Sequence, residues 1–336
     1  MAVFSRRTFL QKSGFAFAAM ALPVNIHVDL KNNTMKKNSV FDVIIIGGSY
    51  SGLAAAMALG RALKNVLVID SGLPCNRQTP HSHNFLTQDG RTPKEIAAIA
   101  KQQVAVYDTV SFVAGKAVSG EKKANGFSIQ TESGEIWQAS QLIFATGIRD
   151  VLPAIKGIAE SWGISVLHCP YCHGYEVRNR KTGIIGNGEV AFEQAKLIAN
   201  WTKELTVFTN GAATFTGIQR DKLAQHGISI EEKELVALEH TNGQVRNVVF
   251  ADHSKKAVDV LYIRSPFEQH CGIPEMLGCE LTEEGYLKTD ASQETTVSGI
   301  YACGDNASRM RTVANAVATG TAVGMGLSRK MIMEQF

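Results

Sequence analysis

Residues 41–52 read Phe-Asp-Val-Ile-Ile-Ile-Gly-Gly-Ser-Tyr-Ser-Gly, and this stretch decides the fold. The apolar run up to Ile46 is typical of a strand that is buried on both faces of a parallel sheet. A glycine-rich turn follows, and then an Ala-rich segment that predicts a helix to about Leu63. A second apolar run, 66–69, ends at Asp70, 23 residues after the first glycine. Together these features predict the βαβ unit that binds dinucleotides.

Each position of this turn has its own task. Gly47 makes the tight turn, and the amide N–H groups at the start of the following helix point at a pyrophosphate. Gly52 allows the helix to pack closely on the strand, and Asp70 can accept hydrogen bonds from ribose hydroxyls. Ser49 stands where the fingerprint has its middle glycine. A glycine-rich turn of some other α/β fold is the alternative interpretation, but the spacing of the acid favours a dinucleotide site.

A second unit of the same kind begins at Lys181. A short strand and a turn lead into a helix over 192–201, and a further strand over 205–208 ends at Asn210. The fingerprint positions of this second site are Gly186, Gly188 and Ala191. A site for NAD has an acid after the second strand, and a site for NADP has an arginine nearby, whereas the first base here is Arg220. The fold of a second nucleotide domain is predicted, and binding of NADPH is left open.

Three further segments complete the expected elements. Thr92-Pro93-Lys94-Glu95 has the capping box and the proline of a helix start. Short alternating segments, one over 135–138, precede a strand over 141–145 that runs into Gly147. A later strand ends in the turn Gly304-Asp305, ahead of a long helix over about 310–331. Four methionines near this helix are expected to fill the core: Met310, Met325, Met331 and Met333.

The strongest chemical signal is the run His-Cys-Pro-Tyr-Cys-His-Gly-Tyr-Glu over residues 168–176. Cys169 and Cys172, three positions apart, can close a small-ring disulfide, and a helix that starts near them would lower the pKa of the attacking thiol. His173 could exchange protons with a thiolate near neutral pH. A redox-active pair is therefore the favoured interpretation.

The competing interpretations are two buried cysteines at helical spacing, and half of a zinc site. A four-cysteine zinc site needs a second pair, and Cys271 and Cys279 have the wrong spacing for it, so no metal site is expected. Cys75 and Cys303 are interpreted as small residues without a reactive role. His81-Ser82-His83 is either a solvated loop or a segment at the edge of a cofactor.

Composition and charge exclude several classes of protein. The 336 residues are 45% apolar and 19% charged, which suits a sizeable core in two or three domains and excludes disorder. Residues 1–37 carry six basic side chains and one acid, which leaves 28 basic and 30 acidic groups in the rest of the chain. Proteins that bind nucleic acid have a basic body with clustered Lys and Arg, so nucleic acid is not an expected partner.

The first 37 residues are a different kind of sequence. Arg6-Arg7 precede a weakly apolar run from Gly14 to Leu22, which ends in the small-residue pattern of a cleavage site. This order is typical of a twin-arginine signal, and the run is too short for a stable membrane anchor. We expect residues 1–37 to be a leader and the protein to be exported to the periplasm. If translation starts at Met35 instead, the protein would be cytoplasmic.

The motifs occur in the order found in the low-molecular-weight thioredoxin reductases, which the chain resembles over residues 39–332. The motifs that carry the resemblance are Gly47–Gly52, Ala145–Gly147, Cys169–Cys172, Gly186–Ala191 and Ala302–Asp305. The resemblance implies an α/β fold of two Rossmann-like, three-layer nucleotide-binding domains, the second inserted into the first. The expected FAD-binding domain spans 38–149 and 265–336, and the inserted NAD(P)-type domain, which carries the cysteines, spans 150–264. A homodimer is also implied.

The resemblance further implies FAD as cofactor and roles for the cysteines. Cys172 would face the flavin, and Cys169 would exchange with the substrate. The residues expected to hold FAD, from both parts of the FAD-binding domain, are Gly47, Ser49, Gly52, Asp70, Gly147, Gly304, Asp305, Arg311 and Thr312.

Three departures from the thioredoxin reductases matter. Thr209-Asn210-Gly211 stands where those enzymes have a basic His-Arg-Arg stretch, which makes NADPH doubtful. His173 replaces an Asp, and Arg311-Thr312 is the best match to their Arg-Gln. The runs over 169–176 and 47–52 are more similar to the dithiol oxidases of the gliotoxin and holomycin pathways. Those enzymes pass electrons from a dithiol through FAD to oxygen, and they also tend to carry a His-x-His loop.

The favoured hypothesis is an FAD-dependent thiol–disulfide oxidoreductase that works as a dithiol oxidase and does not rely on NADPH. The first alternative is an NADPH-dependent thioredoxin-disulfide reductase. An alternative of another class is a flavin-binding protein without catalysis, since a fold alone does not guarantee chemistry. The partner would be a small dithiol or disulfide, or a thioredoxin-like protein.

Overall fold

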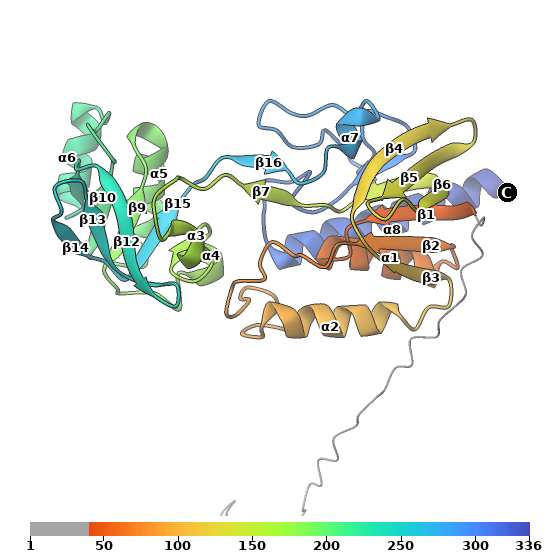
Figure 1. Ribbon diagram of the computed structural model, residues 1–336, viewed down its shortest axis with the longest axis horizontal. Helices are drawn as coiled ribbons and strands as arrows, with labels where there is room; N and C mark the ends of the chain where they lie inside the picture. The colour runs from red at the N-terminus through yellow and green to blue at the C-terminus, as the bar shows by residue number, and fades with distance from the viewer. Residues whose placement is uncertain (1–39) are drawn as a thin grey trace, which may run out of the picture. The chain divides into compact units, whose positions relative to one another are not determined.

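The computed structural model describes residues 40–336 (Figure 1), so the expected leader and the alternative start at Met35 lie outside the described residues. The first sheet has the strand order β3-β2-β1-β6-β5-β4, and β17 also pairs with β6. Its strands are β1 (Val40–Ile46), β2 (Val66–Asp70), β3 (Val110–Ala114), β4 (Ala117–Lys123), β5 (Gly126–Thr131), β6 (Ile136–Phe144) and β17 (Ile300–Ala302). Strands β3, β2, β1, β6 and β17 are parallel, and β4, β5 and β6 form an antiparallel meander.

The buried strand β1 separates two hydrophobic clusters, because successive side chains point to opposite faces of a strand. Val43 and Ile45 belong to the cluster under the helices α1 (Tyr50–Arg61) and α8 (Val313–Gln335). Ile44 and Ile46 belong to the cluster on the other face, with residues of β5 and of the short α7 (Ile273–Met276). Figure 1 shows α8 running alongside α1, with α2 (Pro93–Val104) below them. We call the elements packed around this sheet the first lobe.

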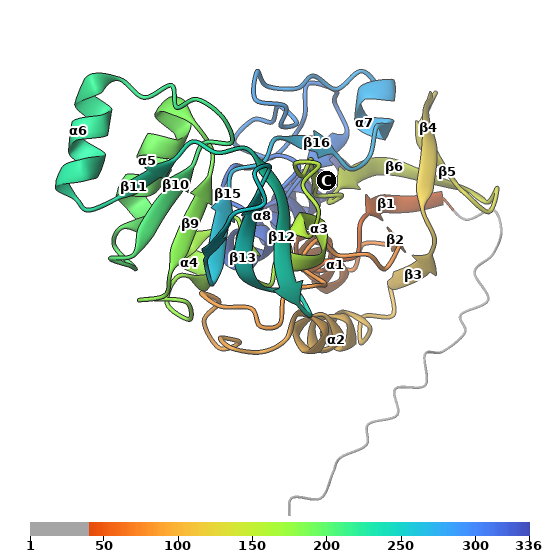
Figure 2. The ribbon, with the colours of Figure 1, turned by 60° about the vertical axis from the view of Figure 1, so that its left-hand side comes forward.

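The second sheet is parallel, with the order β11-β10-β9-β15-β8. Its strands are β8 (Val166–Leu167), β9 (Thr182–Ile185), β10 (Leu205–Phe208), β11 (Ser229–Glu231) and β15 (Val260–Ile263). Helix α5 (Gly188–Ile198) packs on one face, followed by α6 (Gly217–Gln225). The antiparallel sheet of β12 (Leu235–Thr241), β13 (Gln244–Phe250) and β14 (Lys255–Ala257) packs on the other face (Figure 2). We call these elements the second lobe.

The chain leaves the first sheet after β6 and returns to it with β17, so the second lobe is inserted between them. The antiparallel pair β7 (Ile148–Asp150) and β16 (Phe267–Gln269) carries the chain out and back. Short helices α3 (Ile158–Ser161) and α4 (Pro170–His173) precede and follow β8. The predicted α/β fold of two Rossmann-like units is confirmed, while the exact domain boundaries stay a prediction. Among residues 40–336, no helix has both the length and the apolar character of a membrane span.

Several local predictions can be compared with the structure. The capping box at Thr92 and Glu95 is present and starts α2 at Pro93. The segments predicted separately over 135–138 and 141–145 are one strand, β6, because β5 pairs with its first half and β17 with its second half. The core placement of the methionines is wrong for three of the four: Met331 is buried, but Met310, Met325 and Met333 are exposed.

Candidate active site

At the glycine turn after β1, neighbouring backbone atoms lie so close that the glycines have no room for a Cβ atom. Gly47 has a φ of +107°, and a Cβ there would lie 2.3 Å from the carbonyl oxygen of Ala145. A Cβ at Gly52 would lie 1.8 Å from the carbonyl oxygen of Gly47. Ser49 is the N-cap of α1, and its hydroxyl makes no capping hydrogen bond. The first N–H groups of this twelve-residue helix are therefore available to a phosphate at the turn.

Asp70 ends β2 directly beside this turn. A Cβ at Gly48 would meet the Cβ of Asp70 at 2.8 Å, so the two segments touch. The carboxylate is thus placed where the ribose of a nucleotide on the turn would lie. These features fit the adenosine half of a dinucleotide such as FAD.

A second part of this site comes from the end of β17. Gly304 has a φ of +85°, and a Cβ there would lie 2.6 Å from Oγ of Ser51, in the first turn of α1. Gly147, at the end of β6, also has a positive φ of +63°. The side chain of Asn306, fully buried, donates from Nδ2 to the carbonyl oxygen of Phe144 over 2.8 Å. The chain ends of β1, β6 and β17 are thereby held together at one edge of the sheet.

The cysteine pair lies in a cavity of about 140 Å³ that both lobes line. The Sγ atoms of Cys169 and Cys172 are 2.7 Å apart, at the start of α4. Five of the cavity-lining residues were predicted as site residues in addition to Cys169: Cys172, His173, Asp305, Arg311 and Thr312. The structure therefore brings the catalytic candidates and the C-terminal flavin candidates to one place. The other predicted residues do not line this cavity. Gly47, Ser49, Gly52, Asp70, Gly147 and Gly304 lie around the ends of β1, β2, β6 and β17, and Gly186, Gly188 and Ala191 lie in the second lobe.

The two thiols have opposite protonation tendencies. The thiol of Cys172 donates a hydrogen bond to Cys169, and this bond lowers the pKa of Cys169 to about 7, against the effect of burial. Backbone N–H groups of Cys172 and Tyr171 and the charge of Arg311 also favour the Cys169 thiolate. The same hydrogen bond, together with burial, raises the pKa of Cys172 far above its ordinary value. Above about pH 7, the reduced pair therefore holds one proton, on Cys172.

Two histidines next to the pair are neutral at physiological pH. Burial, with a smaller contribution from the nearby His83, lowers the pKa of His173 to about 4. Burial lowers the pKa of His168 to about 4 as well, and the Nδ1 of His168 has no hydrogen-bond partner among the described residues. A neutral imidazole is an acceptor for the proton of an incoming thiol.

The sequence did not point to Asp150, which holds Arg311 in the cavity. The guanidinium of Arg311 donates to both carboxylate oxygens of Asp150, over 2.9 and 2.7 Å. Both side chains are about nine-tenths buried. The Nε of Arg311 lies 4.0 Å from Oδ2 of Asp305 and has no hydrogen-bond partner among the described residues. This unpartnered donor fits a cavity that a cofactor with polar edges completes. Burial raises the pKa of Asp305 to about 6, although Arg311 opposes this rise.

Loop residues of the first lobe complete the cavity. Cys75 lines it, contrary to the expectation of an incidental position. His81 and His83 line it too, so the cofactor-edge interpretation of this segment is favoured over a solvated loop. Within residues 40–336, no three His, Cys, Asp or Glu side chains are grouped as a metal site requires.

In the glycine turn between β9 and α5, the side chain of Asn187 forms hydrogen bonds with backbone groups that a nucleotide would otherwise meet. Asn187 Oδ1 accepts hydrogen bonds from the backbone N–H groups of Gly188 and Thr214, each over 2.8 Å. Its Nδ2 donates to the carbonyl oxygen of Ala212 over 2.9 Å. Glu189 lies in the first turn of α5 and accepts a hydrogen bond from Gln219. The N–H of Gly188, which could bind a pyrophosphate, thus already has a hydrogen-bond partner, and the carboxylate of Glu189 lies next to it.

The end of β10 offers no free base to a ribose phosphate. The hydroxyl of Thr209 donates to the carbonyl oxygen of Gly211 over 2.6 Å, and Asn210 Oδ1 accepts from the backbone of Leu235. Arg220 is paired with Glu232 at 3.0 Å. The other two fingerprint positions, Gly186 and Ala191, pack against each other as in a nucleotide-binding fold. The fold of a nucleotide-binding unit is present, with the side chain of Asn187 bonded across the turn and no arginine directly after β10.

Comparisons with known proteins agree with this architecture. The profile of the family described as "Pyridine nucleotide-disulphide oxidoreductase" matches residues 41–320. Thioredoxin reductase tcpT of Claviceps purpurea is 32% identical over 313 residues, covering 89% of this chain and 97% of that protein. The crystal structure of an oxidoreductase from Agrobacterium tumefaciens is 38% identical with a TM-score of 0.82, over 89% of this chain and all of that one. The crystal structure of HlmI is 30% identical with a TM-score of 0.83, over 88% and 94%. The chain therefore belongs to the pyridine nucleotide-disulphide oxidoreductase family, among its thioredoxin reductase-like members.

Proposed function

We propose that the protein oxidises dithiols with FAD and does not rely on NADPH. The observation that carries this proposal is the combination of a polarised cysteine pair in the cavity with a second nucleotide turn closed by Asn187. Membership of the family makes the protein an oxidoreductase that acts on disulfides. The direction of electron flow, from substrate dithiol to flavin, is the proposed part.

The residues of the first lobe would hold FAD. Gly47, Ser49 and Gly52 would surround the pyrophosphate, and Asp70 the adenosine ribose. Gly147, Gly304, Asp305, Arg311 and Thr312 would lie along the flavin half. When bound, FAD supplies the acceptor for the two electrons of the reduced cysteine pair.

The side chains of the second lobe perform the exchange. His173, which is neutral and lies beside the pair, takes the proton of one substrate thiol. The resulting thiolate attacks Sγ of Cys169, so that a mixed disulfide forms and the Cys169–Cys172 bond breaks, with Cys172 leaving as a thiolate. The second substrate thiol gives its proton to Cys172 and attacks the substrate sulfur of the mixed disulfide, which releases Cys169 as a thiolate. The substrate leaves as a disulfide, and its two electrons reside in the reduced pair.

The test is anaerobic flavin spectroscopy with dithiothreitol, NADPH and NADH offered separately to the FAD-loaded protein. We expect dithiothreitol to bleach the flavin and both nucleotides to leave it oxidised at millimolar concentration. Rapid bleaching by NADPH would overturn the proposal in favour of a thioredoxin-disulfide reductase. Unchanged thiol turnover in Cys169→Ser or Cys172→Ser would favour a flavin-binding protein without disulfide chemistry, and Cys271→Ser, remote from the cavity, is the matched control.

The substrate would contact an exposed aromatic side chain between the cysteines. Tyr171 is 64% exposed, and its ring packs edge-on against Trp201 at 5.6 Å. This surface is open both to a small dithiol and to a thioredoxin-like protein. Comparing dithiothreitol with a reduced thioredoxin as electron donor distinguishes the two substrate classes.

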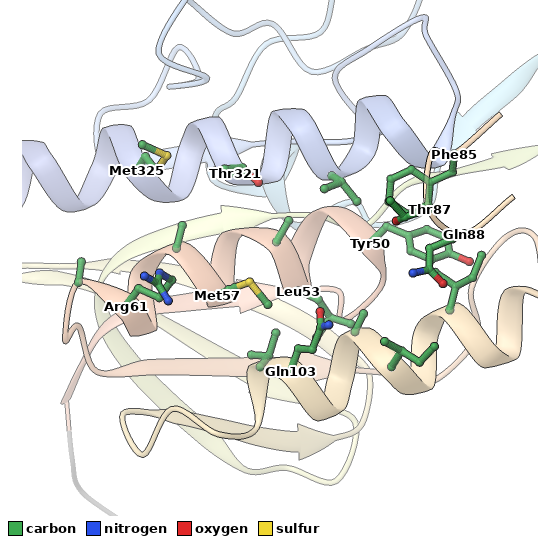
Figure 3. Close-up of a pocket in the computed structure, with 18 of the residues that line it drawn as sticks. Tyr50, Leu53, Met57, Arg61, Phe85, Thr87, Gln88, Gln103, Thr321 and Met325 are labelled. Carbon is green, nitrogen blue, oxygen red and sulfur yellow. The ribbon is translucent and has the colours of Figure 1, made fainter. Parts of the chain in front are cut away.

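We propose that the protein is a homodimer, with the second copy seated on an apolar groove of the first lobe. The groove has a volume of about 660 Å³ and lies along α1, α2 and α8 (Figure 3). Leu53 and Met57 line it from α1, and Met325 from α8. Met325 is 62% exposed, which is unusual for a large apolar side chain unless a partner covers it. Sedimentation at micromolar concentration should give twice the mass of the chain, and a monomer would contradict the proposal.

We also propose that the protein is exported as a folded flavoprotein. The support is sequence alone: the paired Arg6-Arg7 ahead of a short apolar run. Replacing both arginines by lysine should keep the protein in the cytoplasm. Equal periplasmic amounts of both forms would contradict the twin-arginine route, and absence of both forms from the periplasm would favour a start at Met35.

A further inference from the structure

His83 joins the two lobes beside the cysteine pair. Its Nδ1 lies 3.5 Å from Oδ2 of Asp89, in the same loop, and 3.6 Å from Oε1 of Glu176, in the second lobe. The His83 side chain is 19% exposed, whereas Asp89 is 64% and Glu176 is 38% exposed. A largely buried imidazole thus lies between two carboxylates that reach solvent.

The loop that carries His83 is held by its own hydrogen bonds. The backbone N–H of Asn84 donates to Oδ1 of Asp89 over 2.7 Å. The backbone N–H of Ser82 donates to the carbonyl oxygen of Arg91 over 2.8 Å, and Gly90 donates back to Ser82 over 2.9 Å. These bonds fix the loop, so that the placement of His83 at the lobe contact follows from the loop structure.

His83 shares its cavity with the histidine next to the cysteines. His83 and His173 line the same cavity, and His83 is close enough to lower the pKa of His173 by its charge. His81 is the other titratable neighbour, with its ring centre 6.4 Å away, but its Nδ1 is engaged by the carbonyl oxygen of Gly90. The groups around His83 are therefore two histidines and two carboxylates, from both lobes.

Oxidation of a dithiol leaves a proton to be removed from this cavity. The substrate gives up two protons and two electrons as its disulfide forms, and both electrons enter the Cys169–Cys172 pair. Because Cys169 is a thiolate above about pH 7, the reduced pair keeps only one of the two protons, on Cys172. The other proton must leave, and His173, with its low pKa, does not retain it.

We propose that His83 is a positioning residue that relays this proton from His173 to Asp89 and Glu176, whose carboxylates reach solvent. This inference rests on the proposed dithiol oxidation, and it adds a residue that acts through His173 without touching sulfur. The relay is complete only while the second lobe contacts the first, since Glu176 and His173 belong to one lobe and His83 and Asp89 to the other.

The experiment measures how fast dithiothreitol reduces the Cys169–Cys172 disulfide in the full-length protein. Samples are quenched, alkylated and quantified by mass spectrometry, so that the measurement does not depend on the flavin. The variants are His83→Gln and Glu176→Gln, and the matched control is His226→Gln, an exposed histidine at the end of α6. Added imidazole and deuterated solvent test for proton transfer.

We expect His83→Gln to slow reduction about tenfold at pH 7, with partial recovery in millimolar imidazole, because positioned acid–base groups contribute factors of this size or more. Glu176→Gln should slow it severalfold and increase the solvent isotope effect, and His226→Gln should match the wild type. The alkylation rate of the reduced Cys169 thiolate should stay unchanged in all variants.

A His83→Gln rate within twofold of the wild type, or a slow rate that imidazole does not restore, would overturn the relay. If His83→Gln does not fold, Glu176→Gln decides, and an unchanged rate and isotope effect there would overturn it. Failure of the proposed function appears separately, as a flavin that dithiothreitol does not bleach after the disulfide has been reduced.

Discussion

Single residues decide the chemistry of the cavity, and the sequence nominated the cysteine pair that the structure places there. The spacing of Cys169 and Cys172 and the adjacent His173 sufficed to nominate all three. Asp150 was not found, because a lone acid after a strand has no local pattern that reveals a buried arginine 161 residues away. Only the folded chain brings that pair together.

The pKa of Cys169 leads to a prediction on pH dependence. Since the thiolate is the nucleophile, the rate at which iodoacetamide alkylates Cys169 in the reduced protein should rise with pH through about 7 and level off above it. Cys172→Ser replaces the donating thiol and should move the midpoint upward, toward that of an ordinary thiol. The measurement is alkylation followed by mass spectrometry between pH 5 and 10, with Cys271→Ser as control. A midpoint near 9 in the wild type would contradict the assignment.

The Asp150–Arg311 pair leads to a prediction on stability. Asp150→Asn removes one partner of a buried ion pair, which should lower the free energy of unfolding by about 3 kcal/mol. The neighbouring pair of Arg149 and Glu268 is more than half exposed, so Glu268→Gln should cost less than about 1 kcal/mol. Denaturant unfolding of both variants gives the comparison. Equal losses would show that the burial of Arg311 does not matter.

The secondary-structure elements that were predicted well are those whose start or end is marked by residues close by in the sequence. Strand β10 has the predicted bounds, and the capping box places the start of α2. The last helix was predicted from Met310 but begins at Val313, because the hydroxyl of Thr312 caps it by accepting from the N–H of Asn315. Pairing of β17 with β6 depends on contacts far apart in sequence, which a local pattern does not contain.

The contact between α1 and α8 leads to a prediction with an internal control. A Cβ at Gly320 would lie 2.1 Å from the backbone oxygen of Ser51, so Gly320→Ala must push the helices apart and should destabilise the protein by at least about 2 kcal/mol. Gly326, on the same helix, has open space around it, and Gly326→Ala should stabilise the helix by about 0.5–1 kcal/mol. Thermal unfolding of the two variants should therefore show shifts of opposite sign.

For the whole molecule, the sequence predicted the fold class and the insertion of one nucleotide-type unit into another. It did not predict which surfaces stay exposed. The methionines of the last helix were expected in the core, yet Met325 is exposed and lines the groove along α1, α2 and α8 (Figure 3). Hydrophobicity alone does not distinguish a face that packs within the chain from one that a second chain covers.

The proposed homodimer leads to a prediction on assembly. Met325→Glu places a charge in the apolar groove and should shift the protein from dimer to monomer in sedimentation experiments, because a charge buried without a partner is costly. Met333→Glu changes an equally exposed methionine of the same helix outside the groove and should leave the mass unchanged. Identical masses for both variants and the wild type would place the interface elsewhere.

The loop that follows β2 lies between the groove and the cysteine cavity and lines both. Phe85, Thr87 and Gln88 line the groove, whereas His81 and His83 line the cavity that holds the thiols. The phenol of Tyr50, at the end of the groove, accepts a hydrogen bond from Asn76, which also lines the cavity. A second subunit bound in the groove would therefore stabilise this loop and, with it, one side of the cysteine cavity. Specific activity should then fall on dilution, because the dimer dissociates, so that the activity of each subunit would depend on the concentration of the enzyme.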